Sequence, residues 1–421
     1  MQICFPSLYG EGNWLAWFLS QSGHDVAVSI SEPQCGQALA GLVNASDSLS
    51  PAEDYDLAVF DVTGQGKMAD ATRELTPTIG DSMLADRLEE DRIFALEFMQ
   101  KCGISVSPWE QFTNPADAIR YIKQRNTRQV FKPIGEQADK STTYVSKSAE
   151  DMLRYFDVLF RQTPQKEFIL QEVVEGTEVS TEVYITKDGY CALNHTLEVK
   201  KFLNGDLGPN TGCSGSLCWM PPRDNVIFEK GLKKCVEPLI EMGYVGPIDL
   251  NTIVNGSGAW GLEFCARFGY DATALLTKLL PVDFGDFLFR VATGAVIPDL
   301  TPHHMFCASV RLSIPPYPNE GLPKKFFKEG VPIHGLTEKM LDKFFVYDVR
   351  RRGESNDLES AGICGWIGSP MCFGETIGQA FEGCYDMLKA VKVPNGQYRT
   401  DIHSNVARRY AKLKEEGWLR A

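Results

Sequence analysis

Residues 245–267 have the sequence VGPIDLNTIVNGSGAWGLEFCAR, two apolar stretches separated by Asn255-Gly256-Ser257-Gly258. An Asn-Gly pair between apolar stretches favours a tight hairpin turn, so the segment predicts two antiparallel strands. If the turn centres on Gly256, Asp249 lies directly opposite Glu263 in the paired strands. This hairpin is the sharpest feature of the sequence, because it brings two acidic residues together on apolar strands.

Side chains alternate along a strand, so this pairing places Asn251 and Cys265 on the face of the two carboxylates. Two carboxylates opposite each other repel, and burial increases the repulsion. A hard divalent cation such as Mg²⁺ between Asp249 and Glu263 removes that penalty. The alternatives are a solvated face or neutralisation of one carboxylate by Arg267, and the hairpin alone does not decide among them.

Composition narrows the class of protein. The chain has 421 residues, 43% hydrophobic and 23% charged, enough for roughly two to four domains with their own cores. A net charge of −13 argues against general nucleic-acid binding. The longest early apolar run, residues 14–19, is too short to span a membrane, and the amino terminus lacks the basic start of a signal peptide. The twelve cysteines are scattered without a CxxC pair, as in a reducing compartment. We therefore expect a cytoplasmic enzyme that binds neither membranes nor nucleic acids.

The first hundred residues alternate between predicted strands and helices. Residues 1–6, 24–30 and 56–62 have the pattern of strands, and residues 14–22 that of a helix. This order is typical of a βαβ unit with a parallel sheet. Residues 86–101 predict one long amphipathic helix.

The remaining chain has an α+β pattern. A long glycine-containing loop is expected at residues 205–215, and a new α+β unit begins near residue 300. The other predicted elements are strands at 128–133, 167–174, 178–186, 190–199 and 306–314, and a charged helix at 406–417.

Two segments have the chemistry of a nucleotide site. Lys132 lies in an apolar predicted strand and is followed by Gly135 and by Lys140 in a polar turn. Such lysines either reach a bound phosphate or are ordinary surface residues. Residues 172–178, EVVEGTE, join two predicted strands. Their backbone could hydrogen-bond an adenine while Glu178 accepts from ribose hydroxyls, or they form a plain acidic turn.

Residues 208–212, GPNTG, combine a rigid turn with backbone N–H groups and two short polar side chains. This combination suits an anion or a carboxylate, although it also occurs in plain connectors. Residues 10–12, GEG, follow the first strand without the GxGxxG spacing of a dinucleotide site. The sequence also lacks the HExxH, GxSxG and GxxxxGK[ST] motifs, which disfavours a zincin, a serine hydrolase or a P-loop enzyme.

Taken together, these segments resemble the phosphoribosylamine–glycine ligase family of ATP-grasp enzymes. Residues 205–212, GDLGPNTG, are similar to its GD-x-GPNTGG loop, and residues 262–269, LEFCARFG, to its EFN-x-RFGDPE strand. Residues 170–180, LQEVVEGTEVS, resemble its adenine hinge. Residues 374–380 and 398–402, GETIGQA and YRTDI, resemble two pieces near its carboxy terminus. The matches are specific because they occur in the order of the family.

The resemblance implies an α/β and α+β multidomain fold. Residues 1–86 would form a Rossmann-like pre-ATP-grasp domain, and residues 87–298 an ATP-grasp domain with its lid at roughly 104–178. Residues 299–421 would form a small carboxy-terminal α+β domain. ATP and Mg²⁺ are the implied cofactors.

The resemblance also assigns roles to residues. ATP contacts are expected at Arg92, Lys132, Lys140, Gln171, Glu172, Val174 and Glu178. Substrate contacts are expected at Gly10, Gly12, Asp206, Pro209, Asn210, Thr211 and Gly212. Arg267 corresponds to an arginine that meets the transferring phosphate, and Asp249 and Glu263 fall on metal positions used across the fold. Cys265 stands where the family has a metal-binding asparagine, and thiolates suit soft metals, so we expect Asn251 to supply the hard oxygen.

The resemblance is weaker on the acceptor side of the site. The family's amino-terminal GGREHA is GEGNWL here, at residues 10–15, and most lid glycines are missing from residues 132–142. Glu11 would repel a phosphate, and Trp14 would offer a flat apolar surface unless it lies in the core. We therefore expect weak activity with phosphoribosylamine and a preference for a less anionic amine.

The expected reaction joins a carboxylate, most simply that of glycine, to an amine through an acyl phosphate, in purine biosynthesis as in the family. The alternatives are the same chemistry with a different amine, or a catalytically silent nucleotide-binding protein. Retention of Asp249, Glu263, Arg267 and both lysines argues against a silent protein. The expected partners are a small-molecule amino acid and an amine, and the expected state is a monomer or small homo-oligomer.

Overall fold

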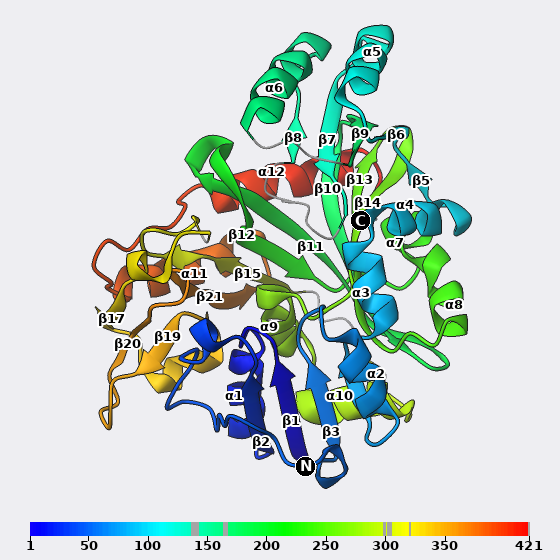
Figure 1. Ribbon diagram of the computed structural model, residues 1–421. Coiled ribbons are helices and arrows are strands. Elements are labelled where there is room, and N and C mark those ends of the chain that lie inside the picture. The colour runs from blue at the N-terminus through cyan, green and yellow to red at the C-terminus, as the bar shows by residue number, and fades with distance from the viewer. Residues whose placement is uncertain (136–142, 163–166, 298–299, 301–304, 320, 420–421) are drawn as a thin grey trace.

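The structure is a computed structural model that describes residues 1–135, 143–162, 167–297, 300, 305–319 and 321–419. Lys140 and the predicted boundary between residues 298 and 299 lie outside the described residues. The model has mixed parallel and antiparallel sheets flanked by helices, which confirms the predicted fold class (Figure 1).

The amino-terminal unit is a four-stranded parallel sheet in the order β2-β1-β3-β4. Its elements are β1 (Gln2–Ser7), α1 (Asn13–Gln21), β2 (Asp25–Ile30), β3 (Leu57–Phe60), α2 (Gly66–Arg73) and β4 (Thr78–Gly80). The predicted βαβ unit is confirmed, because the apolar residues of β1 and β3 are buried between the helices as a parallel sheet requires.

The single helix predicted at residues 86–101 is wrong. The chain forms α3 (Met83–Glu90) and α4 (Arg92–Lys101), separated by Asp91. Asp91 has extended backbone angles, and its side chain accepts a hydrogen bond from the N–H of Phe94 at 3.0 Å. Asp91 is therefore the N-cap of a new helix. The apolar periodicity continues across this break, so the sequence pattern does not reveal it. The domain boundary predicted after residue 86 falls inside α3.

A small antiparallel sheet, in the order β6-β9-β7-β8, projects from the rest of the chain together with α5 and α6 (Figure 1). Its elements are β6 (Trp109–Phe112), α5 (Pro115–Arg125), β7 (Gln129–Pro133), β8 (Tyr144–Val145), α6 (Ala149–Gln162) and β9 (Phe168–Glu172). Phe131, Phe156 and Phe168 form its core by ring contacts 5.1–5.7 Å apart. It occupies the middle of the predicted lid.

A ten-stranded sheet forms the centre of the molecule, in the order β16-β21-β15-β12-β11-β10-β13-β14-β5, with β18 beside β21. Its strands are β5 (Ser105–Val106), β10 (Thr177–Thr186), β11 (Gly189–Leu203), β12 (Leu207–Trp219), β13 (Gly246–Asn255), β14 (Gly258–Cys265), β15 (Phe306–Val310), β16 (Leu312–Ser313), β18 (Phe344–Val346) and β21 (Trp366–Gly374). β15 pairs directly with β12, so the carboxy-terminal segment continues the sheet of the preceding segment.

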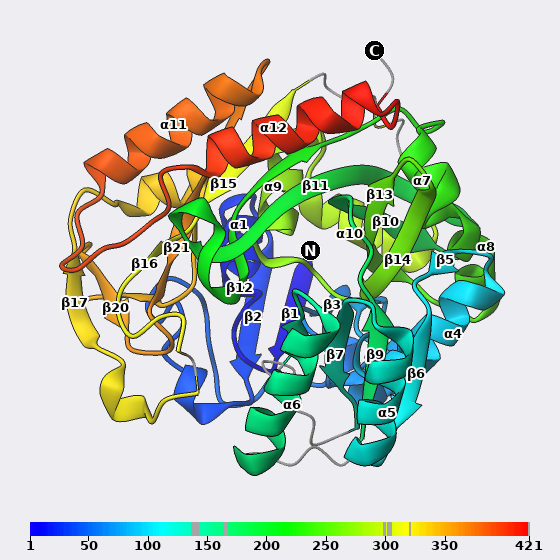
Figure 2. The same ribbon diagram turned by 90° about the horizontal axis from the view of Figure 1, so that it is seen from above.

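The remaining elements cover this sheet or flank it. A three-stranded sheet consists of β17 (Glu329–Ile333), β19 (Val349–Arg351) and β20 (Leu358–Ala361). The helices are α7 (Val226–Lys230), α8 (Lys233–Glu241), α9 (Tyr270–Leu279), α10 (Phe284–Thr293), α11 (Ile377–Ala390) and α12 (Ile402–Glu415). Helices α11 and α12 lie together over one side of the sheet (Figure 2). In the described part of the chain, every helix is too short or too polar to cross a membrane.

Candidate active site

The β13–β14 hairpin forms as predicted, but its register differs. Asp249 pairs with Cys265 and Asn251 pairs with Glu263, so the prediction that Asp249 directly faces Glu263 is wrong. The register shifts beyond Asn251, because Leu262 is an extra residue in β14 and creates a β-bulge. The two carboxylates are therefore diagonal neighbours, and all four polar residues share one face of the sheet, as predicted.

A third acidic residue lies beside this pair. Glu182 of β10 pairs with Asp249, and Ser180 pairs with Asn251. The Ser180 hydroxyl donates a hydrogen bond to the Asp249 carboxylate. Burial raises the pKa of Asp249 well above its usual value and that of Glu182 to about 7. Sequence analysis missed Glu182, although it lies on the same strand face as Glu178, four residues earlier.

The polar atoms of this face fit a hard divalent cation. Oδ1 of Asp249 and Oδ1 of Asn251 are buried and accept no hydrogen bond from any described residue. Hydrogen-bond acceptors that are buried without a partner are costly, and a cation that prefers oxygen ligands removes the cost. The described residues contain no cluster of three or more His, Cys, Asp or Glu suited to a metal, so Asn251 is needed for the donor set. Burial raises the pKa of Cys265 well above its usual value, which keeps the thiol neutral and a poor partner for Mg²⁺.

Lys200 of β11 is the central cation of the site, and sequence analysis missed it. Its Nζ lies 2.7 Å from Glu178, 3.8 Å from Glu198 and 3.9 Å from Glu263. Burial alone would lower the pKa of Lys200, but the three glutamates raise it well above its usual value. The sequence did contain a hint of this site. Glu198 and Lys200 are two residues apart on one strand, which places both side chains on the same face.

Five of the predicted residues lie near Lys200 or contact its neighbours, namely Arg92, Lys132, Gln171, Glu178 and Glu263. The Lys132 ammonium donates a hydrogen bond to Oε1 of Gln171 at 2.8 Å. Burial, followed by the nearby charge of Arg92, lowers the pKa of Lys132 to about 8, while Glu263 and Glu178 act in the opposite direction. Burial also lowers the pKa of Arg92. Both side chains are partly exposed, and phosphate oxygens would favour their charged forms.

The predicted adenine hinge is only partly available. The N–H of Glu172 donates to the carbonyl of Pro108 at 2.9 Å, and its carbonyl accepts from the Ser107 hydroxyl at 2.5 Å. Its carboxylate accepts a hydrogen bond from Arg125 at 2.6 Å. The hydrogen-bonding groups of Glu172 are thus engaged within the chain, and its contact with adenine stays a prediction. In the described part of the chain, Val174 makes no hydrogen bond, which leaves its backbone groups available to a base.

Arg267 lies at the carboxyl end of the β13–β14 hairpin, next to Glu89 of α3. Its Nε donates to Glu89 at 2.8 Å, and its guanidinium lies 4.8 Å from the centre of the Tyr270 ring. Burial alone would lower the pKa of Arg267, but Tyr270 and Glu89 raise it well above its usual value. Arg267 is thus a positioned cation whose role toward a phosphate stays a prediction.

The glycine loop after β1 uses its donors internally. The N–H of Gly10 donates to Oγ of Ser7 at 2.7 Å, and the N–H of Gly12 donates to Asp61 at 2.6 Å. The Ser7 hydroxyl donates to the same Asp61 oxygen at 2.7 Å. These two backbone groups are thus engaged with Ser7 and Asp61, and their contact with substrate stays a prediction.

Trp14 does not line an acceptor site as a stacking surface. It is 1% exposed, and its indole N–H donates to the carbonyl of Leu341 at 2.9 Å. Its position in the core follows from the apolar face of α1, and the stacking expectation is wrong. Glu11 accepts a hydrogen bond from the Tyr270 hydroxyl at 2.7 Å.

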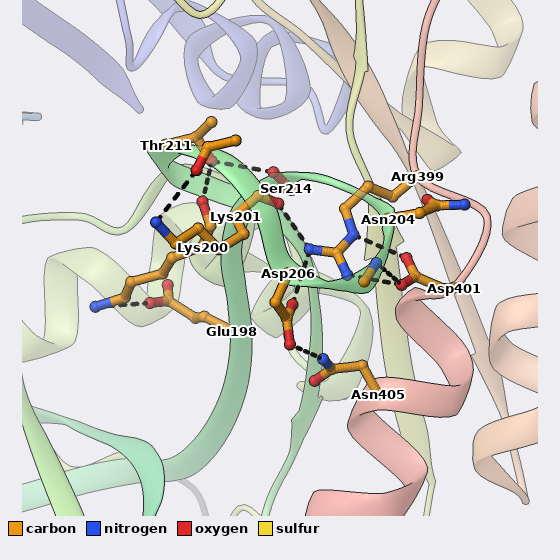
Figure 3. Close-up of polar contacts among 12 residues, drawn as sticks. Glu198, Lys200, Lys201, Asn204, Asp206, Thr211, Ser214, Arg399, Asp401 and Asn405 are labelled. Atoms are coloured by element: carbon orange, nitrogen blue, oxygen red, sulfur yellow. Dashed lines mark hydrogen bonds and ion pairs between the residues drawn. The ribbon is translucent and has the colours of Figure 1, made fainter. Parts of the chain in front are cut away.

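The glycine-rich segment expected to be a loop is instead the tip of the β11–β12 hairpin (Figure 3). Asp206 accepts from Arg399 at 3.0 Å and from Asn405 at 2.9 Å. The N–H of Gly205 donates to Asp401 at 2.8 Å. These contacts join two segments about 200 residues apart in the sequence. The Asp206 carboxylate thus anchors the tip, and its contact with substrate stays a prediction.

The rest of this segment lies along β12. Asn210 pairs with Lys201 across the hairpin, and both Pro209 and Asn210 are exposed. The Thr211 hydroxyl donates to the carbonyl of Lys200 at 2.9 Å. Antiparallel pairing through an irregular register explains why a glycine-rich sequence forms a strand here.

A cavity of about 380 Å³ lies where the three predicted domains meet. It is lined by Glu11 from the amino-terminal unit, by Gly212 and Tyr270, and by Arg311 and Lys324 from the carboxy-terminal segment, among others. It offers acidic and basic side chains and several aromatic rings to a small ligand.

Residues 90–273 match the family model of the ATP-grasp (A) domain of phosphoribosylglycinamide synthetase. This part of the chain is an ATP-grasp domain. The match includes β7, β9, β10 and the β13–β14 hairpin, which carry the residues gathered around Lys200.

Similar proteins extend the likeness to most of the chain. It is 26% identical over 418 residues to the trifunctional purine biosynthetic protein adenosine-3 of Bos taurus, over 93% of this chain but only 41% of that protein. It is 26% identical to phosphoribosylamine–glycine ligase of Streptomyces coelicolor, over 81% of each. The crystal structure of phosphoribosylamine–glycine ligase from Thermotoga maritima has the same fold, with a TM-score of 0.75 at 20% identity, over 95% of this chain and 100% of that one. The predicted resemblance and the ATP-grasp fold are confirmed.

Proposed function

We propose that this chain is an ATP-dependent ligase that joins the carboxylate of a small amino acid, glycine in the first instance, to an amine. The observation that carries the proposal is the close approach of two sets of side chains, one on a face of the ten-stranded sheet and one that also includes Lys132 of the small antiparallel sheet. One set is the oxygen-rich group at Asp249 and Asn251, and the other is the cationic group around Lys132 and Lys200. Together they suit a nucleotide whose phosphates are accompanied by a divalent cation.

The reaction needs activation because a carboxylate is a poor electrophile. A carboxylate oxygen bonds to the γ-phosphorus of ATP, the bond from that phosphorus to the bridging oxygen breaks, and ADP leaves. The amine nitrogen then bonds to the acyl carbon. The bond from that carbon to the phosphate oxygen breaks, phosphate leaves with the bonding electrons, and the nitrogen loses a proton. Catalysis of such transfers is mostly positioning and charge neutralisation.

The chain supplies that neutralisation through named residues. Lys132 and Arg92 would contact the ATP phosphates, with Lys200 beside them, and the backbone at Val174 would receive the adenine. Asp249, Asn251 and Glu263 would hold Mg²⁺, which when bound neutralises phosphate charge. Arg267 would contact the transferring phosphoryl group, since a guanidinium matches a planar anion. Lys140, Gln171, Glu172 and Glu178 complete the proposed ATP contacts.

The names of the relatives support phosphoribosylamine as the amine, and hence a role in purine biosynthesis. Lys324 in the 380 Å³ cavity is a cation that a phosphate would require. A second candidate is a less anionic amine. It is favoured because the N–H groups of Gly10 and Gly12 bind Ser7 and Asp61, and because Glu11 lines the same cavity. The GPNTG segment at residues 208–212 remains a proposed substrate contact through Gly212.

The proposal includes a cytoplasmic setting, small-molecule substrates, and a monomer or small homo-oligomer as the working state. It is supported by the likeness to biosynthetic ligases and by the presence of twelve cysteines without a disulfide.

A matrix of amino acids and amines, assayed for ADP release with Mg²⁺-ATP, tests the proposal. We expect ADP only when both a carboxylate and an amine are present. The amide product should have the mass of the two substrates together minus that of water. Equal ADP release in the absence of any amine, with no amide, would favour the silent or purely hydrolytic alternative.

A further inference from the structure

Arg311 is a buried arginine that none of the roles above uses. It lies between β15 and β16, is 5% exposed, and lines two cavities. One is the 380 Å³ cavity described above, and the other, of about 350 Å³, lies beside the β11–β12 hairpin tip. Arg311 therefore contributes to the walls of both cavities.

The hydrogen bonding of Arg311 is incomplete. Its Nη1 donates to the Tyr317 hydroxyl at 2.8 Å, and the plane of the guanidinium lies 3.7 Å from the centre of the Trp366 ring. Nε and Nη2 are buried and have no hydrogen-bond partner among the described residues. The nearest counter-charge is Asp271, whose carboxylate lies 3.7 Å from Nη2 and accepts a hydrogen bond from Ser309 at 2.8 Å.

Arg399, which lines the same 350 Å³ cavity, shows what a fully hydrogen-bonded buried arginine looks like in this chain. Its Nε and Nη2 bind Asp401 at 2.8 and 2.9 Å, and its Nη1 binds Asp206 and the carbonyl of Lys201 (Figure 3). All three of its nitrogen atoms are satisfied. Arg311 differs because two of its three are not, although it is buried to a similar extent.

Nε and Nη2 form one edge of a guanidinium, and that edge donates two parallel hydrogen bonds to a carboxylate. Buried donors without partners are costly, so this edge gains from a ligand or an ordered water that accepts its hydrogen bonds. The nearby Asp271 already balances much of the positive charge. A singly charged carboxylate therefore fits this position better than a dianionic phosphate.

We propose that Arg311 binds the carboxylate of an amino-acid substrate through its Nε–Nη2 edge. The inference rests on the proposed function and adds a binding residue and a chemical class to it. The carboxylate belongs either to the amino acid that is activated or to an acceptor amine that carries a carboxylate of its own.

The binding test does not depend on turnover. Protein labelled with ¹⁵N-arginine is titrated with glycine, acetate and glycinamide, and the Nε–H resonance of Arg311 is assigned from its loss in Arg311→Lys. We expect glycine or acetate, at up to about 50 mM, to shift this resonance, while glycinamide, which lacks the carboxylate, does not. No shift with either carboxylate, or an equal shift with glycinamide, would overturn the proposal. If the ligase proposal alone is wrong, the shift persists without turnover.

A kinetic comparison distinguishes the two sources. Arg311→Lys keeps the charge but loses the two-bond edge, so the Michaelis constant of the bound substrate should rise about tenfold or more. A rise for glycine identifies the activated amino acid. A rise for β-alanine as acceptor, with none for ethylamine, identifies the acceptor. Changes below about twofold in every arm would overturn the proposal.

Arg399→Lys is the matched control. It should lower the melting temperature by disturbing the contacts with Asp206 and Asp401, while the carboxylate-induced shift of the Arg311 resonance stays intact. Loss of that shift in Arg399→Lys as well would show that the response reports the fold and not the Arg311 edge, which counts against the proposal.

Discussion

Asn251 lies directly opposite Glu263 across the β13–β14 hairpin, and Asp249 is the diagonal neighbour of that carboxylate on the same face. The bulge at Leu262 produces this arrangement by shifting the register one residue. As a result the two carboxylates are farther apart than in direct pairing, and an amide oxygen lies between them. This places a neutral oxygen donor where a cation would otherwise meet only anionic ones.

Asn251→Ala should weaken the binding of Mg²⁺. Removal of the buried Oδ1 takes away one hard oxygen, so the Mg²⁺ concentration at half-maximal ATP turnover should rise about tenfold. Cys265→Ala is the matched control from the same face, and it should change that concentration by less than about twofold. An equal effect of the two substitutions would contradict the assignment of Asn251.

Glu263→Gln should abolish turnover and leave the fold intact. The Glu263 side chain is 48% exposed, and exposed substitutions change stability by only about 0.5 kcal/mol. The loss of charge would remove the proposed metal contact. Turnover with Mg²⁺-ATP and the melting temperature are measured side by side, with the exposed Glu241→Gln as control. Wild-type turnover in Glu263→Gln would show that this carboxylate does not hold the metal.

Nucleotide binding should take up protons near pH 8. Lys132 has a pKa of about 8 in the folded chain, against an ordinary value of 10.5, so about half of it is neutral at pH 8. Phosphate oxygens favour the charged form, and binding ADP without a divalent cation should then add about half a proton at pH 8. The uptake should vanish toward pH 6, where Lys132 is already protonated.

Calorimetry in buffers of different ionisation enthalpy measures this uptake, and Lys132→Met should remove it. The same pKa shift also makes stability depend on pH. Between pH 8 and 10.5 the unfolded chain binds more protons at Lys132 than the folded chain does. The free energy of unfolding therefore rises with pH through that window, because the cost of burying the charged lysine disappears. Equal uptake in the wild type and in Lys132→Met would mean that another group titrates.

Gly80→Ala should prevent stable folding. Gly80 ends β4 with a φ of +104°, and a Cβ there would overlap the carbonyl oxygen of Phe60. Gly23 has a similar φ of +90° but no atom within 4 Å of a Cβ. Gly23→Ala should therefore cost only about 1–2 kcal/mol for the backbone conformation, while Gly80→Ala should cost more than about 4 kcal/mol. Similar denaturation midpoints for both would contradict the packing described for β4.

Local sequence patterns predicted many of the elements but not their exact bounds and relationships. Alternation predicted the β13–β14 hairpin and the shared face of Asp249 and Asn251, because strand geometry is local. The bulge at Leu262 was not predictable, since bulges depend on the partner strand. The split between α3 and α4 was missed because Asp91 interrupts the backbone without interrupting the apolar pattern.

Long-range contacts account for other features that the sequence did not reveal. Asp206 has the sequence context of a ligand loop, yet Arg399 and Asn405 of a distant segment take up its carboxylate. Lys200 and Arg311 each lie in an ordinary strand sequence. Their roles depend on neighbours that only the folded sheet brings together.

The central claim is that a carboxylate oxygen attacks the γ-phosphorus of ATP, and an isotope measurement tests it most directly. Glycine labelled with ¹⁸O in its carboxylate is incubated with the protein, Mg²⁺-ATP and phosphoribosylamine or a reactive amine found in the matrix assay, and the released phosphate is analysed by mass. The account predicts one ¹⁸O atom in each phosphate, matched by one amide and one ADP. Phosphate without the label, released together with ADP, would mean attack by water and would contradict the account.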